Sequence, residues 1–138
     1  MDPKQPNVLV AYDGSEPSRR ALHRVMTFMA DATVAVVTVA SPVYSDPRLA
    51  KFADEAGEEW QQKALAEAKA RLAESGIEAR SSAPVGTAAT EIVRIAEESG
   101  ADLIVLGARG LNPLKRLVLG SVSTKVLHEA PCDVLVVK

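Results

Sequence analysis

Four short apolar runs, each rich in β-branched residues, recur along the chain. They read NVLVAY, TVAVVTVA, DLIVLG and DVLVV and span residues 7–12, 33–40, 102–107 and 133–137. Short apolar runs bounded by turn residues are typical of buried strands. A weaker run over 77–83 alternates apolar and polar side chains, which is typical of an edge strand. The pattern therefore predicts five strands.

The segments between these strands carry apolar residues at helical spacing. Ser15 is placed to cap a helix after the first strand, and Pro17 is tolerated in that helix's first turn. A long amphipathic helix is expected over 49–75, and Gly76 follows it where glycine commonly ends helices. The residues expected to face inward on this long helix are Phe52, Ala56, Trp60, Ala64, Ala68 and Leu72.

Two further helices are expected, one over 87–99 and one beginning near Ser121. In the first of these, Ile92, Val93 and Ala96 should face inward. Strands that alternate with helices imply a mainly parallel sheet covered on both faces. The 138 residues, without repeat or linker, predict a single α/β domain over residues 1–138.

Composition narrows the classes of function. The formal net charge is -2, which argues against general binding to nucleic acid or anionic membranes. One cysteine, Cys132, cannot form an internal disulfide and fits a reducing compartment. The N-terminal residues lack a long apolar segment, and no run approaches membrane-spanning length. A soluble cytoplasmic protein is the simplest expectation.

A glycine-framed segment, GARGLNPLKRLVLGSVSTK, begins at the end of the fourth predicted strand, which is the third of the strongly apolar runs. In doubly wound sheets, ligands bind beyond the carboxyl ends of strands, where the winding direction reverses. Asp13 lies just past the first strand and Gly107 just past the fourth, so neighbouring strands would bring both to one crevice. Gly107 and Gly110 would let the backbone approach a ligand closely or take positive φ.

The end of this segment has the properties of a phosphate site. Gly120 and Ser121 open a helix, whose free N–H groups and positive dipole end attract phosphate. Ser123 and Thr124 add hydroxyl donors at the same end. We therefore expect the segment to wrap a phosphate chain.

The charged residues near the segment leave alternatives open. Asp13 could terminate a strand and cap a turn, but its position favours a ligand or Mg²⁺ role. Lys115 and Arg116 fit a solvated face better than phosphate contacts. Arg109, between two glycines, fits either description equally well. No catalytic constellation is visible, since no G-x-S-x-G elbow occurs and the setting of Cys132 does not suggest a catalytic Cys–His pair.

The familiar nucleotide motifs do not fit this chain. No Gly-Lys pair occurs for a Walker A loop, and DGSEPS follows the first strand instead of a dinucleotide fingerprint. The chain instead resembles the universal stress protein family in its ATP-binding branch. Gly107, Gly110, Gly120 and Ser121 match that family's motif G-x2-G-x9-G-[ST] without insertion. AYDGSEPSRRAL, VGTAATEIVRIAEESGADLIVLGARG and GSVSTKVLHEAPCDVLVV resemble its other segments, so the likeness covers essentially the whole chain.

The resemblance implies a doubly wound, five-stranded parallel sheet in the order 3-2-1-4-5, an adenine nucleotide alpha-hydrolase-like fold. It also implies ATP bound at this crevice and a homodimer joined through the last strand, 133–137. Whether ATP, ADP or AMP is the ligand stays open, as does a Mg²⁺ ion held through Asp13, which the position of that residue suggests. The residues that the resemblance assigns to the nucleotide are Asp13 and the backbone of Val39 on the ribose and adenine side, and Gly107, Arg109, Gly110, Gly120, Ser121, Val122 and Ser123 around ribose and phosphates.

Three functions follow as hypotheses. The first is a small cytoplasmic stress-response protein regulated by ATP, with unidentified protein partners that read its surface. The second is a slow ATP hydrolase or phosphotransferase, although no clear base is visible to orient water or a second substrate. The third is a nucleotide-free interaction module whose glycines serve only the fold.

Overall fold

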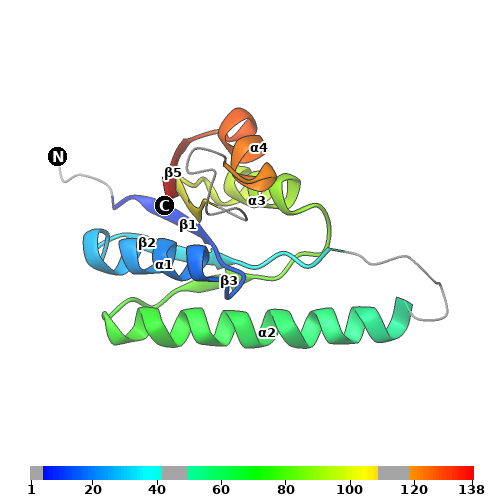
Figure 1. Cartoon of the computed structure of the whole chain (residues 1–138). Coiled ribbons are helices and arrows are strands. Elements are labelled where there is room, and N and C mark those ends of the chain that lie inside the picture. The colour runs from blue at the N-terminus through cyan, green and yellow to red at the C-terminus, as the bar shows by residue number, and fades with distance from the viewer. Residues whose placement is uncertain (1–4, 42–49, 109–118) are drawn as a thin grey trace.

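The computed structural model describes residues 5–41, 50–108 and 119–138, with only the backbone described for 50–56. Five parallel strands form one sheet in the order β3-β2-β1-β4-β5, which confirms the expected topology (Figure 1). The elements are β1 (Asn7–Ala11), α1 (Glu16–Phe28), β2 (Thr33–Val37), α2 (Ala50–Glu74), β3 (Arg80–Ser82), α3 (Ala88–Ser99), β4 (Leu103–Gly107), α4 (Ser121–Glu129) and β5 (Asp133–Val137).

The central strand β1 pairs with β2 on one side and with β4 on the other. Val8 is in register with Val34 of β2 and with Leu103 of β4. The chain therefore winds outward from β1 in one direction and later returns to continue in the other. The carboxyl ends of β1 and β4 lie side by side at this reversal, which is where such sheets bind ligands.

The helix boundaries follow the chemistry of the sequence. The Oγ of Ser15 accepts a hydrogen bond from the N–H of Ser18 at 3.4 Å, so the expected cap of α1 is present. Gly76 follows α2 with φ of +75°, and Gly100 ends α3 with φ of +64°. Both glycines adopt the left-handed conformation that ends helices, as expected for Gly76.

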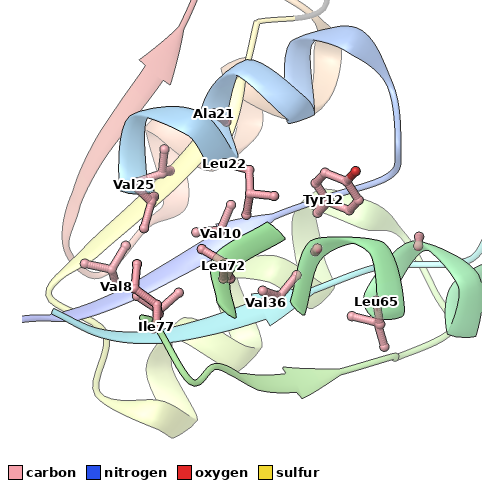
Figure 2. Close-up of a cluster of buried hydrophobic side chains, with 14 of the residues drawn as sticks. Val8, Val10, Tyr12, Ala21, Leu22, Val25, Val36, Leu65, Leu72 and Ile77 are labelled. Atoms are coloured by element: carbon pink, nitrogen blue, oxygen red, sulfur yellow. The ribbon is translucent and has the colours of Figure 1, made fainter. Parts of the chain in front are cut away.

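Helices cover both faces of the sheet, and each face has its own apolar cluster. On one face, Leu22 and Val25 of α1 and Leu72 of α2 pack against β1 and β2 and are fully buried (Figure 2). On the other face, Ile92 of α3 and Val126 of α4 belong to the second cluster. In Figure 1, α3 and α4 lie together on the side of the sheet opposite α2.

The inward face of α2 differs from the expected one. Ala64, Ala68 and Leu72 are buried as predicted, but Trp60 is 40% exposed, so its expected place in the core is wrong. Each helical residue turns by about 100°, so Trp60, twelve residues before Leu72, lies about 120° away from it around the helix. Gln61, eleven residues before Leu72, returns to the buried face and is 2% exposed. The side chain of Phe52 lies outside the described residues.

Two smaller expectations also need correction. The edge strand is limited to Arg80–Ser82, whereas residues 77–83 were expected to be extended. Ile77 is buried, but it belongs to the turn after α2, where its N–H donates to the carbonyl of Leu72. In α3, Ile95 is buried in the core and Val93 is only half-buried.

Candidate functional site

A hollow lies at the carboxyl ends of β1 and β4, where the topology places a ligand. Its lining includes five of the residues expected to contact a nucleotide: Asp13, Val39, Gly107, Val122 and Ser123. They come from the ends of β1 and β4, the chain after β2 and the first turn of α4. The structure thus brings together segments that are far apart in sequence.

The other expected site residues are placed differently. Gly120 and Ser121 stand at the N-terminus of α4, as predicted, but neither lines the hollow. Arg109 and Gly110 lie outside the described residues, as do Lys115 and Arg116. The roles assigned to these four residues therefore stay predictions.

The loop from β1 into α1 is shaped by Asp13. Its Oδ1 accepts a hydrogen bond from the N–H of Ser15 at 2.9 Å, and Gly14 between them has φ of +81°. The N–H of Asp13 donates to the Oγ of Ser18 at 3.3 Å. Asp13 is half-buried beside the hollow. The carboxylate therefore has the turn-forming role that the sequence left open, at a place where one of its faces borders the ligand site.

Gly107 is required by packing between β4 and α1. A Cβ at this position would lie 2.5 Å from the carbonyl carbon and oxygen of Pro17, which is closer than real Cβ atoms come to backbone. Among the described residues, the glycines with positive φ are Gly14, Gly76 and Gly100, so the positive φ considered for Gly107 is wrong. The close approach that its small size allows is toward the start of α1.

The start of α4 is fixed against the end of β4. The Oγ of Ser123, which is 1% exposed, donates to the carbonyl of Gly107 at 3.2 Å. Gly120 caps the helix with φ of -63° and ψ of 161°, and its carbonyl accepts from the N–H of Thr124 at 3.0 Å. The N–H groups of the first turn precede that first helical bond and have no intrahelical acceptor. This end of the site thus combines aligned N–H groups with a positive dipole end, which suits an anion.

The opposite part of the hollow is apolar. Val37 and Val39 line it from the β2 side, and Ile92 and Leu106 line it from α3 and β4. Sequence reasoning missed Val37, Ile92 and Leu106 as site residues, because apolar side chains carry no chemical signature of a ligand. Their position at strand and helix ends is the signal that could have found them. A flat apolar ligand group with an attached anion fits this combination of walls.

Tyr12 connects the site to α2. Its ring is 2% exposed, and its hydroxyl donates to Oε1 of Glu67 at 2.6 Å. The Nε of Arg19 donates to the same carboxylate oxygen at 3.1 Å. Burial, followed by the Glu67 carboxylate, raises the pKa of Tyr12, and the Tyr12 hydroxyl lowers the pKa of Glu67. Tyr12 is therefore the neutral donor and Glu67 the charged acceptor at neutral pH.

Neither a metal-binding cluster nor a membrane-spanning helix is found among the described residues. Within 5–41, 50–108 and 119–138, no cluster of three or more His, Cys, Asp and Glu residues is arranged to hold a metal ion. No helix in those ranges has the length and hydropathy needed to cross a membrane. Burial raises the pKa of the Cys132 thiol, which disfavours the reactive thiolate.

The chain is similar to known proteins over almost its entire length. The model of the universal stress protein family matches residues 6–138. Universal stress protein YxiE of Bacillus subtilis is 38% identical over 144 aligned residues, which cover 95% of this chain and 97% of that protein.

Solved structures agree with this relationship. Universal stress protein UspA from Lactobacillus plantarum has a TM-score of 0.83 and 25% identity, and the match covers 99% of this chain and 100% of that one. A universal stress protein solved in complex with cAMP has a TM-score of 0.75 and 30% identity, covering 96% of this chain and 97% of that one. This chain belongs to the universal stress protein family.

Proposed function

We propose that this protein binds ATP, and that nucleotide occupancy regulates a surface read by other proteins. The observation that carries the proposal is the convergence of Asp13, Val39, Val122 and Ser123 on one hollow at the switch point of the sheet. The similar protein solved with cAMP supports an adenine nucleotide as the class of ligand.

Each wall of the hollow suits one part of ATP. The adenine ring would lie against the apolar side chains, beside the backbone of Val39, and the phosphates would lie at the N-terminus of α4. Asp13 would border the ribose, and its carboxylate would help to hold a Mg²⁺ ion that the phosphates also bind. The hydroxyl of Ser123 is already bonded to Gly107, so its contribution would come from its N–H group.

The test begins with the nucleotide that copurifies with the protein, released by denaturation and compared with ATP, ADP, AMP and cAMP standards. Titration with ATP, with and without Mg²⁺, then gives the affinity. Val122→Glu places a carboxylate at the expected phosphate position, so we expect at least about a tenfold loss of ATP affinity from charge repulsion. Glutamate is well tolerated in the first turn of a helix, but Val122 also packs against the second apolar cluster, so a thermal unfolding curve establishes that the variant is folded before affinities are compared.

Thr124→Glu is the matched control. It introduces the same charge in the same helical turn, but Thr124 is exposed and does not line the hollow. Its hydroxyl, expected as a donor to phosphate, instead donates to the carbonyl of Gly120 at 3.1 Å. Equal losses in the two variants would indicate a long-range charge effect and argue against the site. Failure of the wild type to bind any adenine nucleotide would favour the nucleotide-free module. Copurified ADP would call for a time course of ATP hydrolysis, since turnover would identify the hydrolase.

We also propose that two copies associate through β5. This strand pairs with β4, and its other edge has no strand partner within the described residues. Leu135 on β5 is 37% exposed and Leu127 on the preceding helix is 43% exposed, so an apolar surface accompanies that edge. Sedimentation should give a dimer at micromolar concentration, and Leu135→Lys should shift it toward monomer. A wild-type monomer would contradict this arrangement.

A further inference from the structure

The long helix α2 makes an unusual polar contact with the sheet. Gln61 is 2% exposed, although polar side chains are rarely buried without a reason. Its Nε2 donates to the carbonyl of Thr38 at 2.8 Å and to the carbonyl of Pro84 at 2.8 Å. One carbonyl belongs to the chain leaving β2 and the other to the chain leaving β3. Gln61 therefore joins three segments at one point.

Thr38 extends this contact toward the centre of the sheet. Its side chain is fully buried, and its Oγ1 donates to the carbonyl of Tyr12 at 2.7 Å. The N–H of Thr38 donates to the carbonyl of Ser82 at 3.1 Å. A continuous set of buried hydrogen bonds thus connects α2 with the ends of three neighbouring strands.

Val39 lies within this set and lines the hollow. On its N-terminal side is Thr38, held by Gln61, and on its C-terminal side is Ala40, whose N–H donates to the carbonyl of Pro84 at 3.1 Å. The carbonyl of Ala40 in turn accepts from the N–H of Gly86 at 2.9 Å. Both neighbours of Val39 are therefore fixed through groups that Gln61 contacts directly.

Glutamine is well suited to this position. A neutral side-chain amide offers two N–H donors, which equals the number of carbonyls that Nε2 contacts. A leucine of similar size would supply neither donor. The buried carbonyl of Thr38 would lose the Gln61 contact, which is costly for a buried polar group. The carbonyl of Pro84 would also lose that contact but would keep its bond from Ala40. A glutamate would place acceptors against acceptors.

We propose that Gln61 is a positioning residue of the nucleotide site: it sets the position of the Val39 backbone, and through it occupancy of the hollow is coupled to α2. This inference rests on the proposed ATP site. Because coupling free energies are reciprocal, a nucleotide that requires the Gln61 contacts must also strengthen the docking of α2. Helix α2 is then an element whose docking reports whether the site is filled.

The experiment compares wild type, Gln61→Leu, Gln61→Asn and a matched control, Gln62→Leu. Gln62 is the exposed neighbour on the same helix, so its replacement changes composition equally without touching the carbonyls. ATP and inorganic tripolyphosphate serve as probes. We expect Gln61→Leu to weaken ATP binding about tenfold, because the adenine wall is displaced, while tripolyphosphate affinity is unchanged. Gln62→Leu should equal wild type for both probes.

This pair of probes separates positioning from simple stability. A purely structural role would lower the melting temperature but leave the affinities of the folded protein unchanged for both probes. Gln61→Asn retains the amide on a side chain one methylene shorter, so it should fall between wild type and Gln61→Leu for ATP. Equal ATP affinity in all four proteins would overturn the proposal.

A measurement on the wild type keeps the proposal testable if Gln61→Leu fails to fold. Hydrogen exchange with and without ATP should show slower exchange at the amides of Ala40 and Gly86 and in α2 around Gln61. ATP binding without slower exchange in α2 would overturn the coupling while leaving the proposed function intact. A wild type that binds no nucleotide would overturn both, so the two failures are distinguishable.

Discussion

The two faces of the sheet differ in how deeply their helices are packed. Beneath α1 and α2, Leu22, Val25 and Leu72 are each 0% exposed. Beneath α3 and α4, Val126 is fully buried, but Ile95 keeps 9% of its surface exposed and Val122 is only half-buried. On the first face, α2 also makes two polar contacts: Gln61 donates to the carbonyl of Thr38, and Glu67 accepts from the hydroxyl of Tyr12.

We interpret this difference as a division of roles, in which one face contributes more to stability and the other leaves room for a ligand. The hollow opens at the carboxyl ends of the strands, where Ile92 and Val122 line it from the less deeply packed face and Pro17 and Ser18 line it from the start of α1. A binding site needs apolar surface that is left incompletely packed, and that surface contributes less to stability than a sealed core does. The face under α1 and α2 is more deeply packed and stabilises the strands whose ends form the hollow.

The largest expected effect tests this contrast directly. Leu72→Ala should lower the free energy of unfolding by about 4 kcal/mol, because it leaves a sealed cavity, whereas Ile92→Ala should cost about 2 kcal/mol. The smaller value is expected because Ile92 borders a hollow that already exists. Urea unfolding of both variants measures the two costs. Equal costs would remove the proposed distinction between the faces.

Replacing two glycines by alanine should change the stability by smaller amounts and in opposite directions. Gly107→Ala should destabilise by about 2 kcal/mol, because its Cβ would collide with the backbone of Pro17 and force α1 away from β4. Gly57→Ala, inside α2, should stabilise by about 0.5–1 kcal/mol, since alanine favours a helix. The new Cβ would meet the Cβ of Ala40 at an ordinary 3.8 Å. Thermal unfolding of the two variants should shift in opposite directions, and a stabilising Gly107→Ala would contradict the packing.

The smallest effect concerns pH. The hydrogen bond from Tyr12 holds the pKa of Glu67 below its ordinary value of 4.5. The folded state therefore binds this proton less readily than the unfolded state, so the stabilisation is present above pH 4.5 and is lost as the pH falls through the folded pKa. Glu67→Gln should reduce the loss of stability below pH 4.5, by at most about 1 kcal/mol because Glu67 is partly exposed.

The control for this prediction is Glu74→Gln, which makes the same charge change on the same helix. Glu74 is exposed and lies at the end of α2. Chemical unfolding at a series of pH values should show a flatter acid limb for Glu67→Gln than for Glu74→Gln. Matching acid limbs would mean that the Tyr12 contact contributes nothing measurable.

The sequence predicted the strands and their α/β arrangement, because these depend on local patterns. That the hollow binds a nucleotide stays a prediction. Apolar runs defined β1 and β4, and the residues immediately after them were correctly placed together. The family resemblance supplied the strand order, which the sheet confirms. The sequence predicted that Gly107 allows a close approach to the backbone. That the neighbour is Pro17 depends on tertiary packing, which no local pattern reveals.

The buried face of α2 was predicted less well, because the expected stripe used a spacing of four residues throughout. Such a stripe drifts by about 40° at each step, whereas alternating spacings of four and three follow one face. Gln61, Leu65, Ala68 and Leu72 have those alternating spacings and are all buried. The signal for Gln61 was thus present in the sequence, as a polar residue on an apolar stripe.

The pairing of β1 with β4 has a consequence for the order of events during synthesis. Asn7 at the start of β1 donates its N–H to Asp102 just before β4, across a separation of 95 residues. The second half of the hollow, including Ser123, is made later still. Until the segment that forms α4 has been made, the chain holds only part of the hollow's lining, so a ligand of the hollow can stabilise only the folded domain in which both parts are present. Such a ligand would act on the folded domain and would not assist the early steps of folding.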